Sequence, residues 1–182
     1  GRVFQDPMMG TAADMQIEEN LALAYRRGKK MTLMPGITAK ERARYKELLA
    51  MLDLGLEDRL TSKVGLLSGG QRQAITLLMA TLQNPKLLML DEHTAALDPQ
   101  TASKVLSLTD KLVSEGEITT LMITHNMRDA ITYGNRLIMM NKGEIVFDIS
   151  GEAKHKLTIE ELIKKFSEAS NEMPSDRTLL QD

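Results

Sequence analysis

The stretch Leu66-Leu67-Ser68-Gly69-Gly70-Gln71-Arg72-Gln73 decides how this chain folds, because it predicts where a central helix begins. Ser68 and Gln71 stand three positions apart before an apolar run. This is the spacing of a capping box, so we expect a helix over roughly residues 70–83 with Ser68 as its N-cap. Gly69 and Gly70 allow another group to approach the backbone closely. A helix N-terminus with free N–H groups and a serine hydroxyl suits an anion, above all a phosphate. By itself, a capped helix after a glycine turn explains the stretch equally well.

A short apolar run that ends in two acids follows this helix. Asn84-Pro85 stops the helix, and Leu87-Leu88-Met89-Leu90 is typical of a strand buried on both faces of a parallel sheet. Asp91 and Glu92 then stand at the carboxyl end of the strand, where open α/β sheets bind ligands. One carboxylate can hold Mg²⁺, directly or through water, and the other can orient or deprotonate a water. Many strands end in acids, so the pair gains its meaning from following the Ser-Gly-Gly-Gln element at this distance.

Both elements resemble parts of the ATP-binding-cassette (ABC) ATPases. Residues 67–71 resemble the family signature, and residues 87–92 resemble its Walker B strand. Three more elements follow the family order and spacing: Ala96-Leu97-Asp98 resembles the D-loop, His125 after the apolar strand 121–124 resembles the switch histidine, and Gln5 resembles the Q-loop glutamine. Chance agreement of all five elements is very improbable, and the resemblance covers about residues 1–150.

Length and composition restrict the class of protein. The chain has 182 residues, 42% of them hydrophobic, which is enough for a folded domain with a sizeable core. Its net charge of -2 argues against a nucleic-acid-binding surface. It has no cysteine, so neither a disulfide framework nor a thiolate metal site is expected. Its apolar runs are too short for a membrane span, and no secretory signal is visible.

The resemblance implies a fold class and a division of the chain. The expected fold is α/β, a P-loop NTPase-like (RecA-like) parallel sheet with an inserted α-helical subdomain and with the N-terminal portion missing. No Gly-x-x-x-x-Gly-Lys-Ser/Thr pattern of a Walker A loop occurs in the sequence, so we expect that loop upstream. The expected parts are the Q-loop end of the core (1–7), the helical subdomain with the signature (8–83), the C-terminal part of the ATPase core (84–166) and a flexible tail (167–182).

Helical and hairpin patterns fill the remaining sequence. Ile17, Leu21 and Ala24 share one face of a helix over about 16–27. A short basic run, residues 26–30, ends it and favours a solvated helix end over a lipid contact. The remaining start and turn signals are capping boxes at Thr38/Glu41 and Thr158/Glu161, an N-cap with first-turn proline at Asp98-Pro99, an N-cap at Asn126, and a hairpin turn at Asn141-Lys142-Gly143.

Three polar residues also have plainer explanations. An isolated glutamine such as Gln5 is usually an ordinary loop residue, and an isolated histidine after a strand, such as His125, is usually structural; their places relative to the other motifs favour functional roles. His93 stands where most relatives of the family have proline. We expect it to be a local hydrogen-bonding group and not a metal ligand, because no second His or Cys has ligand spacing.

The family resemblance assigns the site residues their expected roles. Cassettes pair head to tail, so Ser68 and the amides of Gly69 and Gly70, within the signature that Gln71 completes, would contact the γ-phosphate of ATP held by the opposite subunit. In its own subunit's site, Asp91 would serve Mg²⁺ and Glu92 would be the general base. Gln5 would reach the Mg²⁺ and the attacking water, and His125 would hold the γ-phosphate. Asp98 would communicate across the interface.

The implied function is that of an ATPase that drives solute transport, with import favoured. The expected partners are a second cassette in a homodimer, a transmembrane permease subunit and a substrate-binding lipoprotein, at the cytoplasmic face of a bacterial plasma membrane. The 182 residues alone should hydrolyse little ATP, because the phosphate-cradling loop and its lysine are absent from them. Two alternatives stay open: a soluble cassette ATPase that acts on DNA or ribosomes, and a non-catalytic fragment that binds a partner.

Overall fold

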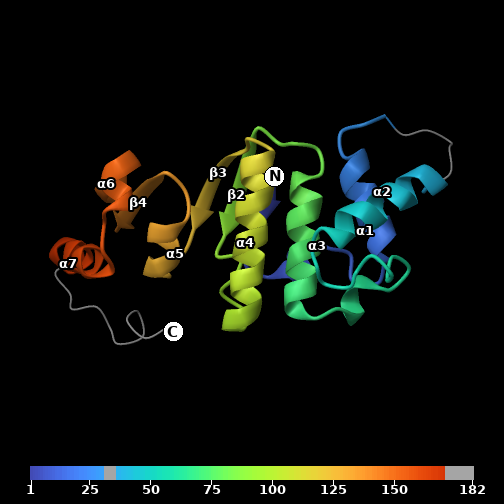
Figure 1. Cartoon of the computed structure of the whole chain (residues 1–182), viewed down its shortest axis with the longest axis horizontal. Coiled ribbons are helices and arrows are strands. Elements are labelled where there is room, and N and C mark those ends of the chain that lie inside the picture. Colours follow the sequence, from blue (N-terminus) through green and yellow to red (C-terminus); the bar gives the residue numbers. More distant parts are fainter. Residues whose placement is uncertain (31–35, 171–182) are drawn as a thin grey trace. The chain divides into compact units, whose positions relative to one another are not determined.

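The computed structural model describes residues 1–30 and 36–170, which form two compact units. The first comprises Gly1–Ile123 and the second begins at Thr124. Figure 1 shows the elements of both, coloured along the sequence.

A parallel sheet forms one layer of the first unit. Its strand order is β1 (Arg2–Val3), β2 (Leu87–Asp91) and β3 (Thr119–Ile123), with Val3 opposite Leu90 and Asp91 opposite Ile123. The helices of this unit are η1 (Pro7–Gly10), α1 (Ile17–Arg26), α2 (Ala39–Ala50), η2 (Val64–Leu66), α3 (Gly69–Thr81) and α4 (Pro99–Glu115). Helices α3 and α4 lie side by side (Figure 1).

The core of the first unit is shared by the sheet and the helices around α3. Val3, Leu88 and Leu90 of the strands belong to the same apolar cluster as Ile75 and Leu77 of α3. The cluster also includes residues of α1 and α2, among them Ile17, Leu21, Tyr45 and Leu49. The domain boundaries expected at 7/8 and 83/84 therefore fall inside one compact unit.

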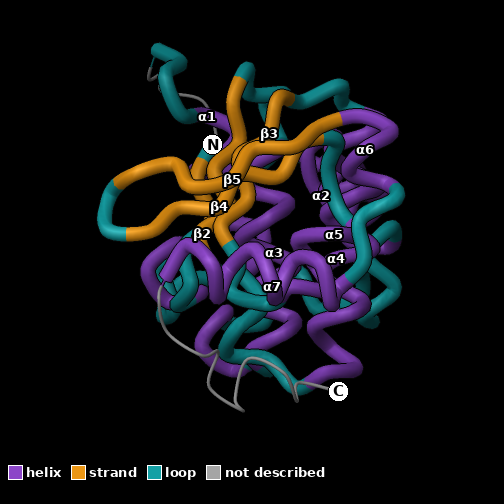
Figure 2. Tube along the Cα trace, turned by 90° about the vertical axis from the view of Figure 1, so that its left-hand side faces the viewer, coloured by secondary structure: helices purple, strands orange, loops and turns teal. Residues whose placement is uncertain are grey.

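The second unit is built on an antiparallel hairpin. Strands β4 (Arg136–Asn141) and β5 (Glu144–Ser150) pair with a register shift between Met139 and Met140. Figure 2 shows this hairpin as two adjacent strands joined by a loop. Lys142 and Gly143 both adopt positive φ, 50° and 87°, as the predicted tight turn requires. Helices α5 (Met127–Thr132), α6 (Gly151–His155) and α7 (Ile159–Ser170) complete the unit.

The predicted helix starts are confirmed. Ser68, Thr38 and Thr158 each accept a hydrogen bond from the amide three residues later, and the Gln71, Glu41 and Glu161 side chains bond back to them. Asp98 caps α4 ahead of Pro99, and Asn126 caps α5. Helix α7 continues to Ser170, so the boundary expected at 167 falls within a helix, and residues 171–182 of the expected tail lie outside the described residues.

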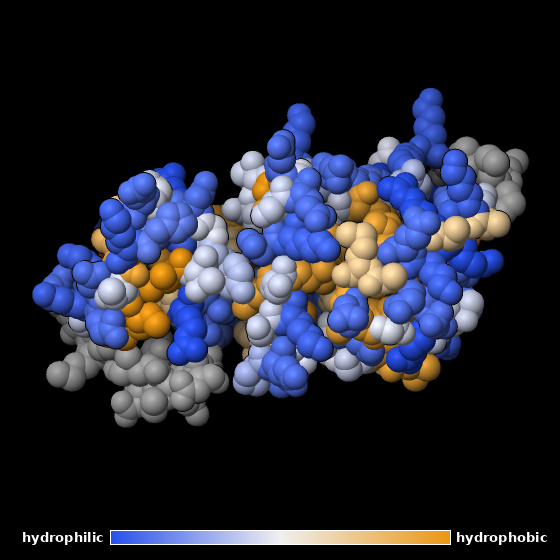
Figure 3. Space-filling view, viewed as in Figure 1, coloured by the Kyte–Doolittle hydropathy of each residue, from blue (hydrophilic) through white to orange (hydrophobic). Residues whose placement is uncertain are grey.

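One expectation about the sheet is wrong. Strand β2 was expected to be buried on both faces, but its residues alternate: Leu88 and Leu90 are buried, whereas Leu87 is 47% exposed and Met89 37%. On β3, Leu121 and Ile123 are each 49% exposed. The continuous apolar run hid this alternation, because a run of leucines and methionines does not distinguish the two faces. Figure 3 shows apolar areas between the polar side chains on one face of the molecule.

Candidate functional site

The tip of α3 carries donors in a fixed arrangement. The Ser68 Oγ accepts a hydrogen bond from the Gln71 amide at 3.3 Å, and the Gln71 Oε1 accepts from the Ser68 amide at 3.2 Å. The serine hydroxyl thus keeps its hydrogen for another acceptor. The first hydrogen bond within the helix runs from the Arg72 amide to the Ser68 carbonyl, so the Gly69 and Gly70 amides precede it. The first turn holds no acidic residue, so an anion meets no carboxylate of that turn.

Neighbouring segments brace this tip. The Gln71 Nε2 donates to the Leu54 carbonyl at 3.2 Å. The Arg72 guanidinium donates to the carbonyls of Gly65 and Leu67, which lie in the segment leading into the helix. These contacts fix the path of the chain as it enters α3, which keeps the Ser68 hydroxyl in place.

The two glycines differ in what surrounds them. A Cβ on Gly70 would lie 2.0 Å from the Thr101 Cγ2, whereas a Cβ on Gly69 would make an ordinary 3.5 Å contact with Leu97. The close packing of α3 on the start of α4 therefore requires glycine at 70, independently of any ligand. Gly69 is exposed, and its lack of a side chain opens the backbone to solvent.

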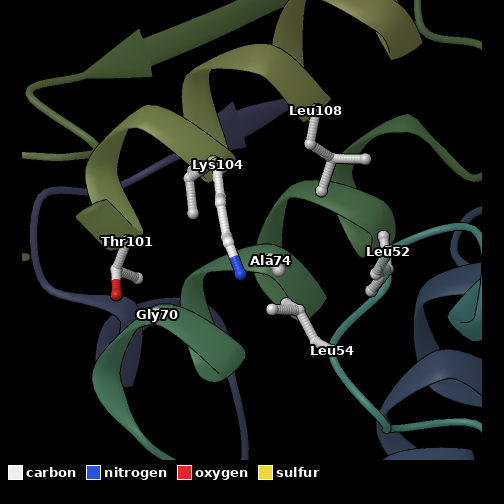
Figure 4. A pocket seen from close by; sticks show the side chains of 8 residues that line it. Leu52, Leu54, Gly70, Ala74, Thr101, Lys104 and Leu108 are labelled. Carbon is white, nitrogen blue, oxygen red and sulfur yellow. The ribbon is translucent and has the colours of Figure 1, made fainter.

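A small hollow lies beside this helix pair. Its volume is about 20 Å³, room for about one water molecule. Figure 4 shows Lys104 extending from α4 toward α3 across it, with Leu52 and Leu54 on the other side. The hollow is far too small for a nucleotide, whereas Ser68 and Gly69 are exposed at the tip of α3.

At the end of β2, two side chains that are far apart in sequence meet. The Gln5 Nε2 donates to the Glu92 Oε2 at 3.2 Å. Glu92 adopts the left-handed backbone conformation, φ 44°, and its amide donates to the Ile123 carbonyl at 3.0 Å. Such a conformation is uncommon in a residue with a side chain, and it persists where surrounding contacts hold it.

Asp91 is the neighbouring carboxylate, and it forms an ion pair. Its Oδ2 lies 2.9 Å from the Arg2 Nη2, with both side chains partly exposed. The described residues hold no group of three or more His, Cys, Asp or Glu side chains that could cage a metal ion. Mg²⁺ is usually bound through one or two carboxylates together with substrate phosphates and waters. The oxygens of Asp91 and Glu92 match that donor chemistry, and a cation at Asp91 would compete with Arg2.

His93, next to Glu92, is buried, with 2% of its surface exposed. Its Nε2 lies 3.1 Å from the Thr109 Oγ1 of α4. Burial lowers the pKa of His93 from 6.5 to about 4, so the ring is neutral near pH 7. The expectation that His93 is a local hydrogen-bonding group is confirmed.

Asp98 and His125 occupy two further turns. The Asp98 Oδ1 accepts from the Thr101 amide at 3.0 Å, and hydrogen bonding from the Thr101 side chain and backbone holds the pKa of Asp98 below its ordinary value.

His125 belongs to the second unit, just before the N-cap Asn126, whose Oδ1 accepts from the amides of Arg128 and Asp129. The structure thus brings Gln5 and Glu92 together, while the position of His125 relative to them is not defined.

Gln73 has a role that its place in the sequence does not indicate. Its side chain is fully buried, and its Nε2 donates to the Phe4 carbonyl at 3.2 Å, one residue before Gln5. The central helix is thereby tied to the segment that presents Gln5. A polar residue in the run Gln71-Arg72-Gln73 carries no sequence signal for burial, so only the fold could identify it.

Comparisons with known proteins identify relatives of this chain. Residues 1–95 match the family model described as ABC transporter. The chain is 50% identical over 168 residues to the tyrosine transport ATP-binding protein of Clostridioides difficile (strain R20291), covering 92% of this chain and 66% of that protein. It is 36% identical over 134 residues to a methionine import ATP-binding protein of Bacillus thuringiensis subsp. konkukian (strain 97-27), covering 71% of this chain and 38% of that protein.

Solved structures of ATP-binding cassettes share the fold of this chain. A dimeric bacterial ABC transporter cassette is 31% identical with a TM-score of 0.66, covering 82% of this chain and 62% of that one. A post-hydrolysis dimer of an ATP-binding cassette bound to ADP and Pi is 30% identical with a TM-score of 0.65 and the same coverage. The chain therefore spans less than two thirds of each of these proteins. Within the residues that the structure describes, no helix is both long and apolar enough to cross a membrane.

Proposed function

Since this chain belongs to the ABC transporter family, we propose that it forms part of an ATP-binding subunit that hydrolyses ATP at a head-to-tail interface between two copies and thereby drives the import of a solute. The relatives named for tyrosine transport and methionine import favour an amino acid as that solute. The further partners would be a transmembrane permease and a substrate-binding lipoprotein, with the subunit at the cytoplasmic face of the membrane.

The observation that carries this proposal is the hydrogen bond between Gln5 and Glu92. It places an amide and a carboxylate together at the carboxyl end of β2, directly beside Asp91. In phosphoryl transfer the protein acts mainly by positioning groups and stabilising charge. A carboxylate held by an amide at a strand end is suited to orienting a water and taking its proton.

Each residue of the site would then have one task. Glu92 accepts the proton of the attacking water, and Gln5 keeps the Glu92 carboxylate and that water aligned. Asp91 would hold Mg²⁺, which when bound neutralises the charge that develops on the phosphate oxygens. His125 would donate a hydrogen bond to a γ-phosphate oxygen.

The tip of α3 would serve the partner's nucleotide. The Ser68 hydroxyl and the Gly69 and Gly70 amides would donate to the γ-phosphate of ATP bound mainly by the other copy. Gln71 would fix the serine through the capping box. Asp98, at the start of α4, would couple the two ATP sites across the interface. The chain by itself should hydrolyse little ATP, because its sequence contains no Gly-x-x-x-x-Gly-Lys-Ser/Thr loop.

The test is Glu92→Gln in the complete protein. The substitution keeps the shape and removes the base, so ATP turnover should fall by about 100-fold or more, while ATP binding is retained. Turnover is measured as phosphate release, and binding with a fluorescent ATP analogue. Glu115→Gln, at the exposed end of α4, is the matched control and should hydrolyse ATP normally. Near-normal turnover of the Glu92→Gln protein would remove Glu92 from the role of base.

A further inference from the structure

His93, the residue after Glu92, is linked by its side chain to the middle of α4. Its imidazole is almost completely buried, and its Nε2 lies 3.1 Å from the Thr109 Oγ1. Thr109 is itself buried. A buried polar pair of this kind is directional, whereas an apolar contact at the same place would tolerate sliding.

The proton positions in this pair follow from the hydrogen bonds. The Thr109 hydroxyl donates its one hydrogen to the Val105 carbonyl at 2.8 Å. Toward His93 the same oxygen can therefore act only as an acceptor, so the His93 Nε2 carries a hydrogen and donates it. The result is a continuous chain of hydrogen bonds from the turn after β2, through Thr109, to the backbone of α4.

This chain of hydrogen bonds bears directly on the orientation of Glu92. Glu92 and His93 share a peptide group, so fixing the His93 ring restricts the ψ angle of Glu92. The other contacts of Glu92 hold its amide on the Ile123 carbonyl and its carboxylate beside Gln5. The left-handed conformation of Glu92 needs such support from several sides.

We propose that His93 is a positioning residue, which through Thr109 holds the Glu92 carboxylate in the orientation that ATP hydrolysis requires. This inference rests on the proposed function, because it assigns His93 a task in the reaction of Glu92. His93 itself does not touch the substrate.

The experiment compares substitutions of both partners in the complete protein. His93→Ala removes the donor and Thr109→Val removes the acceptor, and either should lower kcat by about 10- to 100-fold with the KM for ATP unchanged. His93→Gln and Thr109→Ser keep a donor or an acceptor at the same reach and should restore kcat. The double variant His93→Ala/Thr109→Val should lose no more than either single variant, because both remove the same interaction.

Thr81→Val is the matched control. Thr81 is also a buried helical threonine, and its hydroxyl bonds to the Leu77 carbonyl four residues earlier, as Thr109 bonds to Val105. It has no part in the turn after β2. Its substitution should leave kcat at the wild-type value, and a loss equal to that of Thr109→Val would overturn the proposal.

Hydrogen exchange without nucleotide supplies a second readout. The amides of Glu92 and Ala95 are hydrogen-bonded in this turn, and they should exchange faster in His93→Ala and Thr109→Val than in His93→Gln or Thr81→Val. Unchanged exchange together with wild-type kcat in His93→Ala would contradict the inference. If the complete wild-type protein hydrolyses no ATP, the proposed function fails instead, so the two failures are distinguishable.

Discussion

The turn after β2 is anchored to β3, to α4 and to the segment that carries Gln5, whereas the turn after β3 is capped by its own neighbours. In the first turn the Glu92 amide bonds to Ile123, and His93 bonds to Thr109, sixteen residues away. In the second turn the Thr124 Oγ1 accepts from the Asn126 amide, and the Asn126 side chain accepts from Arg128 and Asp129. Both turns carry a residue for which we propose a role in ATP hydrolysis, but they reach their conformations by different means.

The two turns therefore differ in which contacts hold their backbone in place. The first turn depends on partners distant in sequence, one of which is buried, so changes in α4 should be felt at Glu92. The helix that follows the second turn, α5, has no buried residue of its own. It is held at its far end by the buried Lys154 of α6, whose Nζ donates to the carbonyls of Ile131 and Tyr133.

The largest expected effect is a pH dependence of the free energy of unfolding that arises from His93 in the turn after β2. Burial lowers the pKa of His93 to about 4, against 6.5 for an exposed histidine. Between these values the unfolded chain binds the proton more tightly, so stability is highest above about pH 6.5 and is lost as the pH falls toward 4. At about 1.4 kcal/mol per pKa unit, the loss in the free energy of unfolding is about 3 kcal/mol. Urea unfolding at pH 7 and pH 4 measures it.

His93→Gln is the control for this pH effect. It keeps a donor beside Thr109 but does not titrate, while all the carboxylates remain the same. The free energy of unfolding of the wild-type protein should therefore fall more steeply on acidification than that of the variant. Parallel pH profiles of the free energy of unfolding for the two proteins would show that protonation of His93 is not what destabilises the fold in acid.

A smaller effect is expected at the second turn from Lys154→Met. Methionine fills similar space but leaves the Ile131 and Tyr133 carbonyls without the charged donor. The free energy of opening of α5 should fall by about 1–3 kcal/mol, as measured by hydrogen exchange of the Ala130 and Tyr133 amides. The amides of the turn after β2 should exchange as before.

The matched control at this end of α6 is Lys156→Met. Lys156 is exposed and forms an ion pair with Glu152, an interaction of little energetic weight at a surface. Its substitution should leave the exchange of α5 unchanged. Equal protection of α5 in the Lys154 and Lys156 variants would mean that the buried ammonium does not hold this helix.

The starts of several helices could be predicted from the sequence, because helix capping depends on residues close together in the chain. The caps at Ser68, Asp98 and Asn126 each depend on a side chain and an amide two or three residues away, so their spacing identifies them. The α/β cassette fold was predicted from the order of the motifs, and the solved cassettes confirm it. That the end of β2 lies beside Gln5 followed from the family resemblance and from no property of the residues between them.

The features that could not be predicted depend on tertiary packing. The burial of Gln73 and the contact that requires glycine at 70 arise where α3 meets the Gln5 segment and α4. The exposure of Leu87 and Met89 was missed because an apolar run has no visible period. The partner of His93 was not identifiable either, because Thr109 lies on the next helix among other threonines and serines. The roles of the site residues, including the contact of His125 with the γ-phosphate, stay predictions.

The most direct test of the central claim is a structure of the complete Glu92→Gln protein with Mg²⁺ and ATP. We expect two copies in which the side chains at 5, 91, 92 and 125 of one subunit and the Ser68 hydroxyl of the other surround the same γ-phosphate. A structure in which position 92 and His125 lie far apart, or in which Ser68 faces away from the nucleotide of the partner subunit, would contradict it.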